Sequence, residues 1–78
     1  MKMVDEFREG DVIQLLVPND RIGDLMDDWL RRSTEADVRV RRAKTKGHVV
    51  VETQYLLYAS YVVNNYGGVR VNIKKATR

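Results

Sequence analysis

The sequence predicts an α+β fold of the ferredoxin-like type, a split β-α-β-β-α-β chain with a four-stranded antiparallel sheet and two helices on one face. Three observations lead to this prediction. Residues 11–33 change from a short apolar run to helical spacing, residues 37–52 contain two β-prone segments around Gly47, and residues 69–74 alternate after a second helical stretch. Right-handed crossovers would give the strands the spatial order 4-1-3-2, with the first and third strands central.

Residues 11–17 form the first predicted strand, because Gly10 and Pro18 bound a short run that is apolar at nearly every position. A strand without alternation has both faces covered, and this places it in the middle of the sheet.

The first predicted helix covers residues 20–33, with Asn19 or Asp20 as its N-cap. Acidic residues near its start and arginines near its end match the helix dipole. The stripe expected to be buried recurs at helical spacing and consists of Ile22, Leu25, Met26, Trp29 and Leu30.

Residues 37–52 predict a β-hairpin. Val38 and Val40 alternate with arginines in its first strand, Lys46-Gly47 forms the turn, and residues 48–52 form the return strand.

Residues 53–66 fit two interpretations. In the first they form a helix that Thr53 caps and that Gly67 or Gly68 ends. In the second they continue the preceding strand, which gives a β-α-β-β-β chain with a long third strand. Length favours the helix, because a strand over residues 48–63 would be far longer than strands usually are.

The last predicted strand covers residues 69–74, with Val69, Val71 and Ile73 facing inward and the polar residues between them facing outward. Residues 1–9 and 75–78 are expected to be loosely ordered ends of a single domain, 1–78.

The composition excludes several classes of protein. The sequence has no Cys and one His, which excludes a disulfide framework, thiol catalysis and a multi-histidine metal site within one chain. It contains no cofactor fingerprint or nucleophile motif, so we expect a non-enzymatic protein without a cofactor or a metal. No apolar run reaches the roughly 20 residues that cross a bilayer, and the acidic start differs from a signal peptide. We therefore expect a small, basic, cytoplasmic protein without a membrane partner.

Charge divides the sequence into two halves. Residues 1–38 hold five Lys/Arg and ten Asp/Glu, a net charge of −5, whereas residues 39–78 hold nine Lys/Arg and one Glu, a net charge of +8. Such a division predicts an acidic face and a basic face on the folded domain, or an acidic helix beside a basic sheet.

A basic sheet face predicts nucleic-acid binding, because lysines and arginines displace counterions from phosphates. Strand alternation places one group of cationic residues on the face without helices, and the hairpin turn holds a second group beside it. The predicted nucleic-acid-binding residues are Arg39, Arg41, Arg42, Lys44, Lys46, His48, Arg70 and Lys74.

The alternative function is a regulator or inhibitor, of the kind that mobile elements encode, which acts through a protein interface. If residues 53–66 are helical, Leu57 and Tyr61 are apolar residues one turn apart on an otherwise polar arc, where they are candidate interface anchors. An acidic protein partner would fit the basic face. The small size and the apolar second helix also favour a homodimer, formed either between helices or between edge strands.

Overall fold

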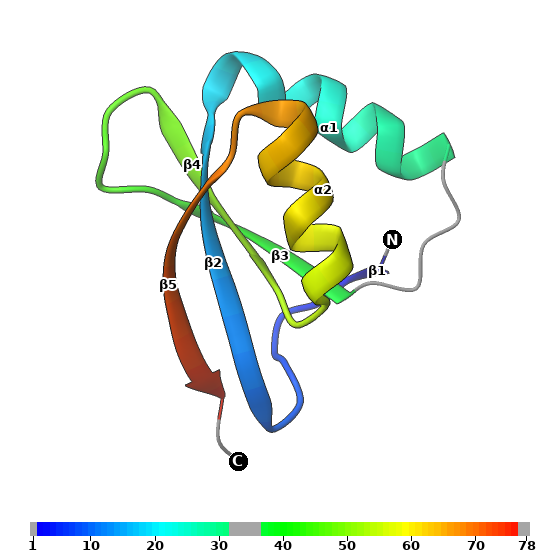
Figure 1. Ribbon diagram of the computed structural model, residues 1–78, viewed down its shortest axis with the longest axis vertical. Helices are drawn as coiled ribbons and strands as arrows, with labels where there is room; N and C mark the ends of the chain where they lie inside the picture. The colour runs from blue at the N-terminus through cyan, green and yellow to red at the C-terminus, as the bar shows by residue number, and fades with distance from the viewer. Residues whose placement is uncertain (1, 32–36, 77–78) are drawn as a thin grey trace.

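A computed structural model of the protein describes residues 2–31 and 37–76. For Lys2 and residues 29–31 it describes the backbone but not the side chains. Along the chain the elements are β1 (Lys2–Met3), β2 (Gly10–Pro18), α1 (Asn19–Arg31), β3 (Asp37–Arg42), β4 (His48–Thr53), α2 (Leu56–Tyr66) and β5 (Val69–Ala76). Figure 1 shows both helices beside a twisted sheet, with the β3–β4 turn extending away from them.

The sheet has the strand order β1-β3-β4-β2-β5. Strands β2 to β5 pair antiparallel with their neighbours, and the short β1 pairs parallel with β3. The predicted α+β class, with four antiparallel strands and two helices, is confirmed. The predicted arrangement is matched in part, because β1 adds a fifth strand beside β3.

Both helices pack on the same face of the sheet. Leu15 in β2 is opposite Val51 in β4, so these two side chains share a face, and both are fully buried. Their cluster contains buried residues of both helices: Leu25 from α1 and Tyr58, Ala59 and Val62 from α2. Leu25 confirms the predicted stripe of the first helix at that position. The side chains of Trp29 and Leu30, and residues 32 and 33 of the predicted helix, lie outside the described residues.

The ambiguous stretch after the hairpin is a strand end followed by a helix. β4 continues to Thr53, and α2 begins at Leu56 with Tyr55 as its N-cap. The predicted cap is wrong by two residues, because Thr53 is the last residue of β4 and its buried hydroxyl accepts a hydrogen bond from the N–H of Tyr55, the N-cap residue itself, at 3.1 Å. Gly67 ends the helix in the left-handed conformation, with φ of 65°, and this confirms the predicted glycine stop. The alternative with one long third strand is therefore excluded.

β5 differs from its prediction. A bulge between its pairings with Gln14 and Leu15 leaves Val71 unpaired, and the strand extends to Ala76. Val69, Val71 and Ile73 are exposed by 59%, 52% and 51%, so the prediction that they are buried is wrong, although Ile73 does lie on the helix face, opposite Ile13. The buried residues of α2 pack against strands β2 and β4 rather than against β5. β5 therefore contributes no buried residue to the core.

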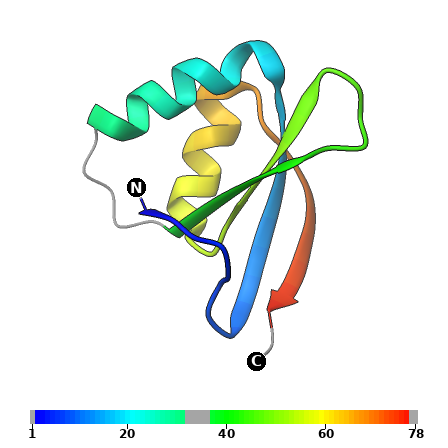
Figure 2. The same ribbon diagram turned by 180° about the vertical axis from the view of Figure 1, so that it is seen from behind.

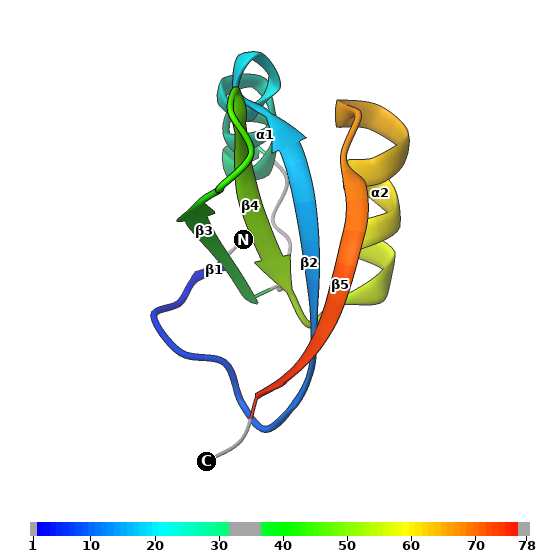
Figure 3. The ribbon, with the colours of Figure 1, turned by 90° about the vertical axis from the view of Figure 1, so that its left-hand side faces the viewer.

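Residues 2–9 lie against the sheet rather than apart from it. Beyond β1, the Val4 N–H donates to the Val38 carbonyl at 3.0 Å, and Phe7 is only 7% exposed. In Figure 3 this N-terminal segment and α2 lie on opposite sides of the sheet. The face without helices is therefore partly covered.

Among the elements that the structure describes, neither helix combines the length and the apolar character that crossing a membrane requires.

Candidate nucleic-acid interface

The face without helices carries a row of polar side chains that crosses four strands. Pairing places Arg39 of β3 beside Glu52 of β4, Glu52 beside Gln14 of β2, and Gln14 beside Asn72 of β5. Arg39 Nε donates to Glu52 Oε1 at 2.8 Å, and Gln14 Nε2 donates to Glu52 Oε2 at 2.9 Å. Asn72 Nδ2 donates to Gln14 Oε1 at 3.2 Å. We call these four residues the polar row.

Glu52 is the fully buried member of the polar row. Burial by itself would raise the pKa of this carboxyl group, because it removes water from the charged form. The hydrogen bonds from Arg39 and Gln14, together with the charges of Arg39 and Arg41, outweigh burial and lower the pKa below its ordinary value. Glu52 therefore stays charged and compensates part of the basic charge on this face.

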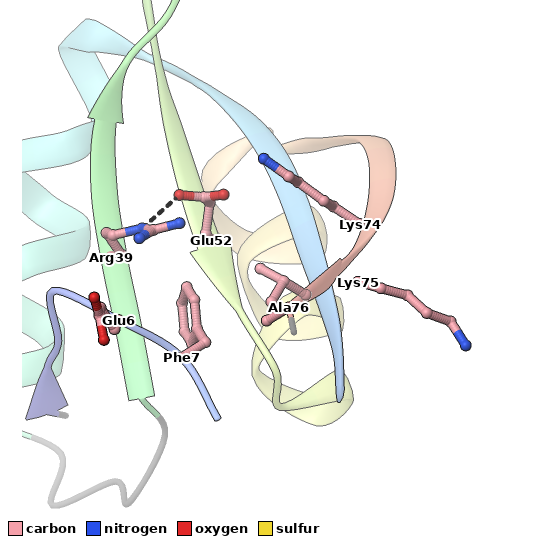
Figure 4. Close-up of a pocket in the computed structure, with 8 residues that line it drawn as sticks. Glu6, Phe7, Arg39, Glu52, Lys74, Lys75 and Ala76 are labelled. Atoms are coloured by element: carbon pink, nitrogen blue, oxygen red, sulfur yellow. Dashed lines mark hydrogen bonds and ion pairs between the residues drawn. The ribbon is translucent and has the colours of Figure 1, made fainter. Parts of the chain in front are cut away.

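Residues 4–9 of the N-terminal segment cover the polar row. Arg39 Nη1 donates to the Asp5 carbonyl at 2.8 Å, and the Arg39 guanidinium lies 5.1 Å from the centre of the Phe7 ring. Gln54 Nε2 donates to the Arg8 carbonyl at 2.7 Å. Figure 4 shows Arg39 and Glu52 facing each other with the Phe7 ring beside them. Arg39, which was predicted to contact nucleic acid, is thus engaged within the protein.

The β3–β4 turn and the strand ends beside it carry the exposed cations, with Arg41 on the face without helices and Arg42 on the opposite face. Arg42, Lys44 and Lys46 are all exposed, and the Arg41 side chain is 52% exposed although its Nη1 lies 3.8 Å from Glu52 Oε1. His48 is half-buried, and its Nδ1 lies 2.9 Å from the Lys46 carbonyl oxygen. A carbonyl oxygen only accepts, so Nδ1 carries the proton. We call residues 41–48 the basic hairpin.

The basic hairpin extends beyond the rest of the domain in both opposite views of the molecule (Figures 1 and 2). The sequence has no Asp or Glu between Asp37 and Glu52. Within the part of the chain that the structure describes, Arg42, Lys44 and Lys46 form no ion pair. The hairpin is therefore a projecting group of cations whose charge is left largely uncompensated.

The two predicted cations of β5 lie away from the basic hairpin. Lys74 is on the expected face but borders the pocket beside Phe7 and Glu52, near the N-terminal segment. The prediction is wrong for Arg70, because the bulge aligns it with Leu15, whose side chain points to the helices. Arg70 instead borders a groove between α2 and β5.

The predicted protein-interface pair does not form one exposed surface. Leu57 is 70% exposed. Tyr61 is half-buried, lies close to the rings of Tyr58 and Tyr66, and donates a hydrogen bond to Asp28 Oδ2 of α1. Tyr61 therefore joins the two helices, and only Leu57 keeps the exposure expected of an anchor.

Asp28 also accepts a hydrogen bond from Tyr66, at 2.8 Å. Burial and the hydrogen bond to Asp28 raise the pKa of Tyr66, so its hydroxyl stays protonated and continues to donate. This connection between α1 and α2 has no signal in the sequence, because Tyr61 and Tyr66 are five positions apart and the Asp28 contact spans more than 30 residues.

Strand alternation places the four residues of the polar row on the face without helices, but sequence analysis missed their hydrogen bonds, the burial of Glu52 and the burial of Phe7. One signal was available: Glu52 is the only acidic residue of the basic half, and it ends a run of three valines in a predicted strand. A lone carboxylate in such a strand indicates a buried partner for an arginine.

Comparison of the chain with known proteins gives no family: no family model matches it, and neither a curated protein nor a solved structure matches it.

Proposed function

We propose that the protein is a non-enzymatic nucleic-acid-binding module whose contact surface is the basic hairpin. The observation that supports this most is the set of four cations, Arg41, Arg42, Lys44 and Lys46, within six residues of a projecting β-turn. Phosphate groups are spaced regularly along nucleic acid, and neutralising them releases counterions, which drives binding without any base contact. The primary site in this proposal excludes Arg39, which Glu52 compensates, and also Arg70 and Lys74, which lie elsewhere.

A projecting hairpin suits this function for a geometric reason. A two-stranded ribbon is narrow enough to enter the major groove of a duplex, or to lie along the backbone of a single strand. The polar row fixes the strands below it, since Glu52 is bonded to neighbours on both sides. The cations therefore project from a fixed base.

The test is fluorescence anisotropy of labelled single- and double-stranded DNA and RNA at several salt concentrations. If four cations each contact a phosphate, log K falls with log salt with a slope of about −3 for single strands and about −3.6 for duplex DNA. The variant Arg42→Glu with Lys44→Glu should lower the affinity strongly and reduce the slope by about 2. Both side chains are exposed, so this change leaves the fold intact.

A matched control carries the same change of charge elsewhere. Arg70→Glu with Lys75→Glu alters two exposed cations of β5, and should bind nucleic acid with nearly the affinity of the original protein. If the hairpin variant keeps its affinity and its salt slope, the proposal is wrong. Equal losses in both variants would show attraction by net charge rather than a site.

We also propose that the four antiparallel strands and two helices are a ferredoxin-like, split β-α-β-β-α-β arrangement extended by β1. The order β5-β2-β4-β3 and the helical connections β2-α1-β3 and β4-α2-β5 support this. Many unrelated functions occur on this fold, so the functional proposal depends on the basic hairpin alone.

A further inference from the structure

The outer edge of β5 is a second candidate binding surface, because no other described strand pairs with it. β5 is the last strand of the described sheet, and an edge strand presents backbone N–H and C=O groups that can pair with another strand. Its apolar side chains Val69, Val71 and Ile73 are each at least half exposed. This edge is eight residues long, whereas β1 at the opposite edge has only two.

A groove runs beside this edge on the helix side of the sheet. Its volume is about 400 Å³, and its apolar lining comes from Leu15 of β2, Val69 of β5, and Leu56, Ala59 and Val63 of α2. Leu56 is 59% exposed. A strand paired with β5 would direct alternate side chains to this side, where an apolar side chain would find apolar walls.

Charge indicates which kind of strand fits. β5 carries Arg70, Lys74 and Lys75 and no acidic residue, and α2 carries no charged residue at all. A second copy of β5 would bring three further cations against these three, and like charges facing each other across strands are destabilising. An acidic strand would have the opposite effect. The cations thus disfavour self-pairing and favour a negatively charged partner.

We propose that the β5 edge binds an extended acidic peptide segment of a protein partner, which adds a strand to the sheet and places apolar side chains in the groove beside α2. This interface is separate from the basic hairpin, and it does not depend on nucleic-acid binding. The bulge at Val71 limits regular pairing to residues 72–76, and the part of the bound segment that continues past the bulge would lie beside Val69 and Arg70, which border the groove. Within that part the Ile73 N–H now donates to Asn72 Oδ1 at 3.0 Å, and a carbonyl of the incoming strand would replace this side-chain oxygen.

The test uses a fluorescein-labelled peptide, Gly-Ser-Glu-Val-Glu-Val-Glu-Val-Glu-Ser, titrated with the full chain in fluorescence anisotropy. We expect saturable binding that weakens with salt. Arg70→Glu with Lys75→Glu should weaken it by at least about tenfold, since the change reverses two of the three positive charges on this strand. The hairpin variant Arg42→Glu with Lys44→Glu should bind the peptide as the original chain does. This crossed design separates the two proposals, because each double variant should lose one ligand and keep the other.

Two further peptides test the mode of binding without altering the protein. Replacing two central valines with proline keeps the charge but prevents strand pairing, so it should abolish binding. Replacing every Glu with Lys should also abolish it. Absence of binding by the acidic peptide, retention of binding in the β5 variant, or equal binding of the proline peptide would each overturn the proposal. So would a dimer in sedimentation that the β5 variant abolishes, because a second copy would then occupy the edge.

Discussion

Glu52 is a charged group with no exposed surface, and the structure shows why it is tolerated. Two hydrogen bonds and the nearby Arg41 supply the interactions that water would otherwise provide. Removing one partner of such a pair costs more than the pair contributes, because the other charge is left without compensation.

Replacing Glu52→Gln should therefore destabilise the protein at neutral pH by about 2 kcal/mol, less than for a fully buried pair because Arg39 is partly exposed. Urea unfolding at pH 7 measures this difference. Glu9→Gln, at an exposed carboxylate, is the control and should have little effect.

The same residue sets an acid dependence. The pKa of Glu52 is lowered from its ordinary value of 4.5 in the folded protein, so its stabilising contribution is complete above pH 4.5 and is lost as the pH falls through the folded pKa. The free energy of unfolding of the original protein should decline in that range, and that of Glu52→Gln should decline less. Parallel curves for the two proteins would contradict this assignment.

Tyr66 gives the corresponding prediction at alkaline pH. Its pKa is raised above the ordinary 10.0, so its contribution is complete below pH 10 and is lost as the pH rises further. Tyr66→Phe removes the hydrogen bond to Asp28 and should cost about 1.5 kcal/mol at pH 7, while it weakens the loss of stability above pH 10. Tyr55→Phe changes an exposed tyrosine and is the matched control; equal effects of the two variants would argue against the Asp28 contact.

At the scale of elements, α2 starts without a stabilising cap. Tyr55 has the extended conformation of an N-cap, with φ of −101° and ψ of 107°, but its side chain makes no capping hydrogen bond and the first turn has no acidic residue. Tyr55→Asp supplies both an acceptor and a favourable charge, and should stabilise the protein by about 1 kcal/mol. Thermal unfolding followed by circular dichroism measures the gain. Tyr55→Ala removes the same ring without adding a cap, and a matching gain in that variant would contradict the explanation.

The elements also show what the sequence can predict. The hairpin and the first helix were predictable because their periodicity depends on one face being buried, and β2 was predictable as a central strand because both its faces are covered. The observed start of α2 lies two residues after the predicted one, since Thr53 is a good cap in isolation but is buried in β4. The pairing of Thr53 with Ile13 in the sheet therefore outweighs the local preference of Thr53 for a helix N-cap.

Two other elements could not be predicted from local pattern. The bulge in β5 reverses the alternation at Val71, so Arg70 changes face although nothing in the residues themselves marks the site. The N-terminal segment looked unstructured because it is charged, yet a single aromatic residue, Phe7, places it on the sheet. At the candidate site, the cations of the basic hairpin were foreseen, whereas the compensation of Arg39 by Glu52 depends on which strands are neighbours.

At the scale of the whole molecule, a chain of 78 residues has little stability to lose. A domain of this size is typically stable by only about 5 kcal/mol or slightly more. Phe7→Ala should remove about 3 kcal/mol, because it empties a buried site between the N-terminal segment and the sheet. The melting temperature should fall by well over 10 °C, as about 1 kcal/mol shifts it by 4–8 °C in so small a domain. Phe7→Leu still fills most of the buried site, so its melting temperature should stay close to that of the original protein. An unchanged melting temperature in Phe7→Ala would show that the N-terminal segment adds nothing to the stability of the fold.

The two outermost strands differ, and this limits how large an assembly can grow. Continuous addition of copies, as in a fibril, requires an unpaired edge strand on each side of every subunit. Here β1 pairs with only two residues of β3 and leaves residues 39–42 of that strand beyond it, whereas β5 offers residues 72–76 for regular pairing on the other side. The two edges therefore differ in continuity, and a strand that pairs with β5 leaves no matching uninterrupted edge on the far side for the next addition.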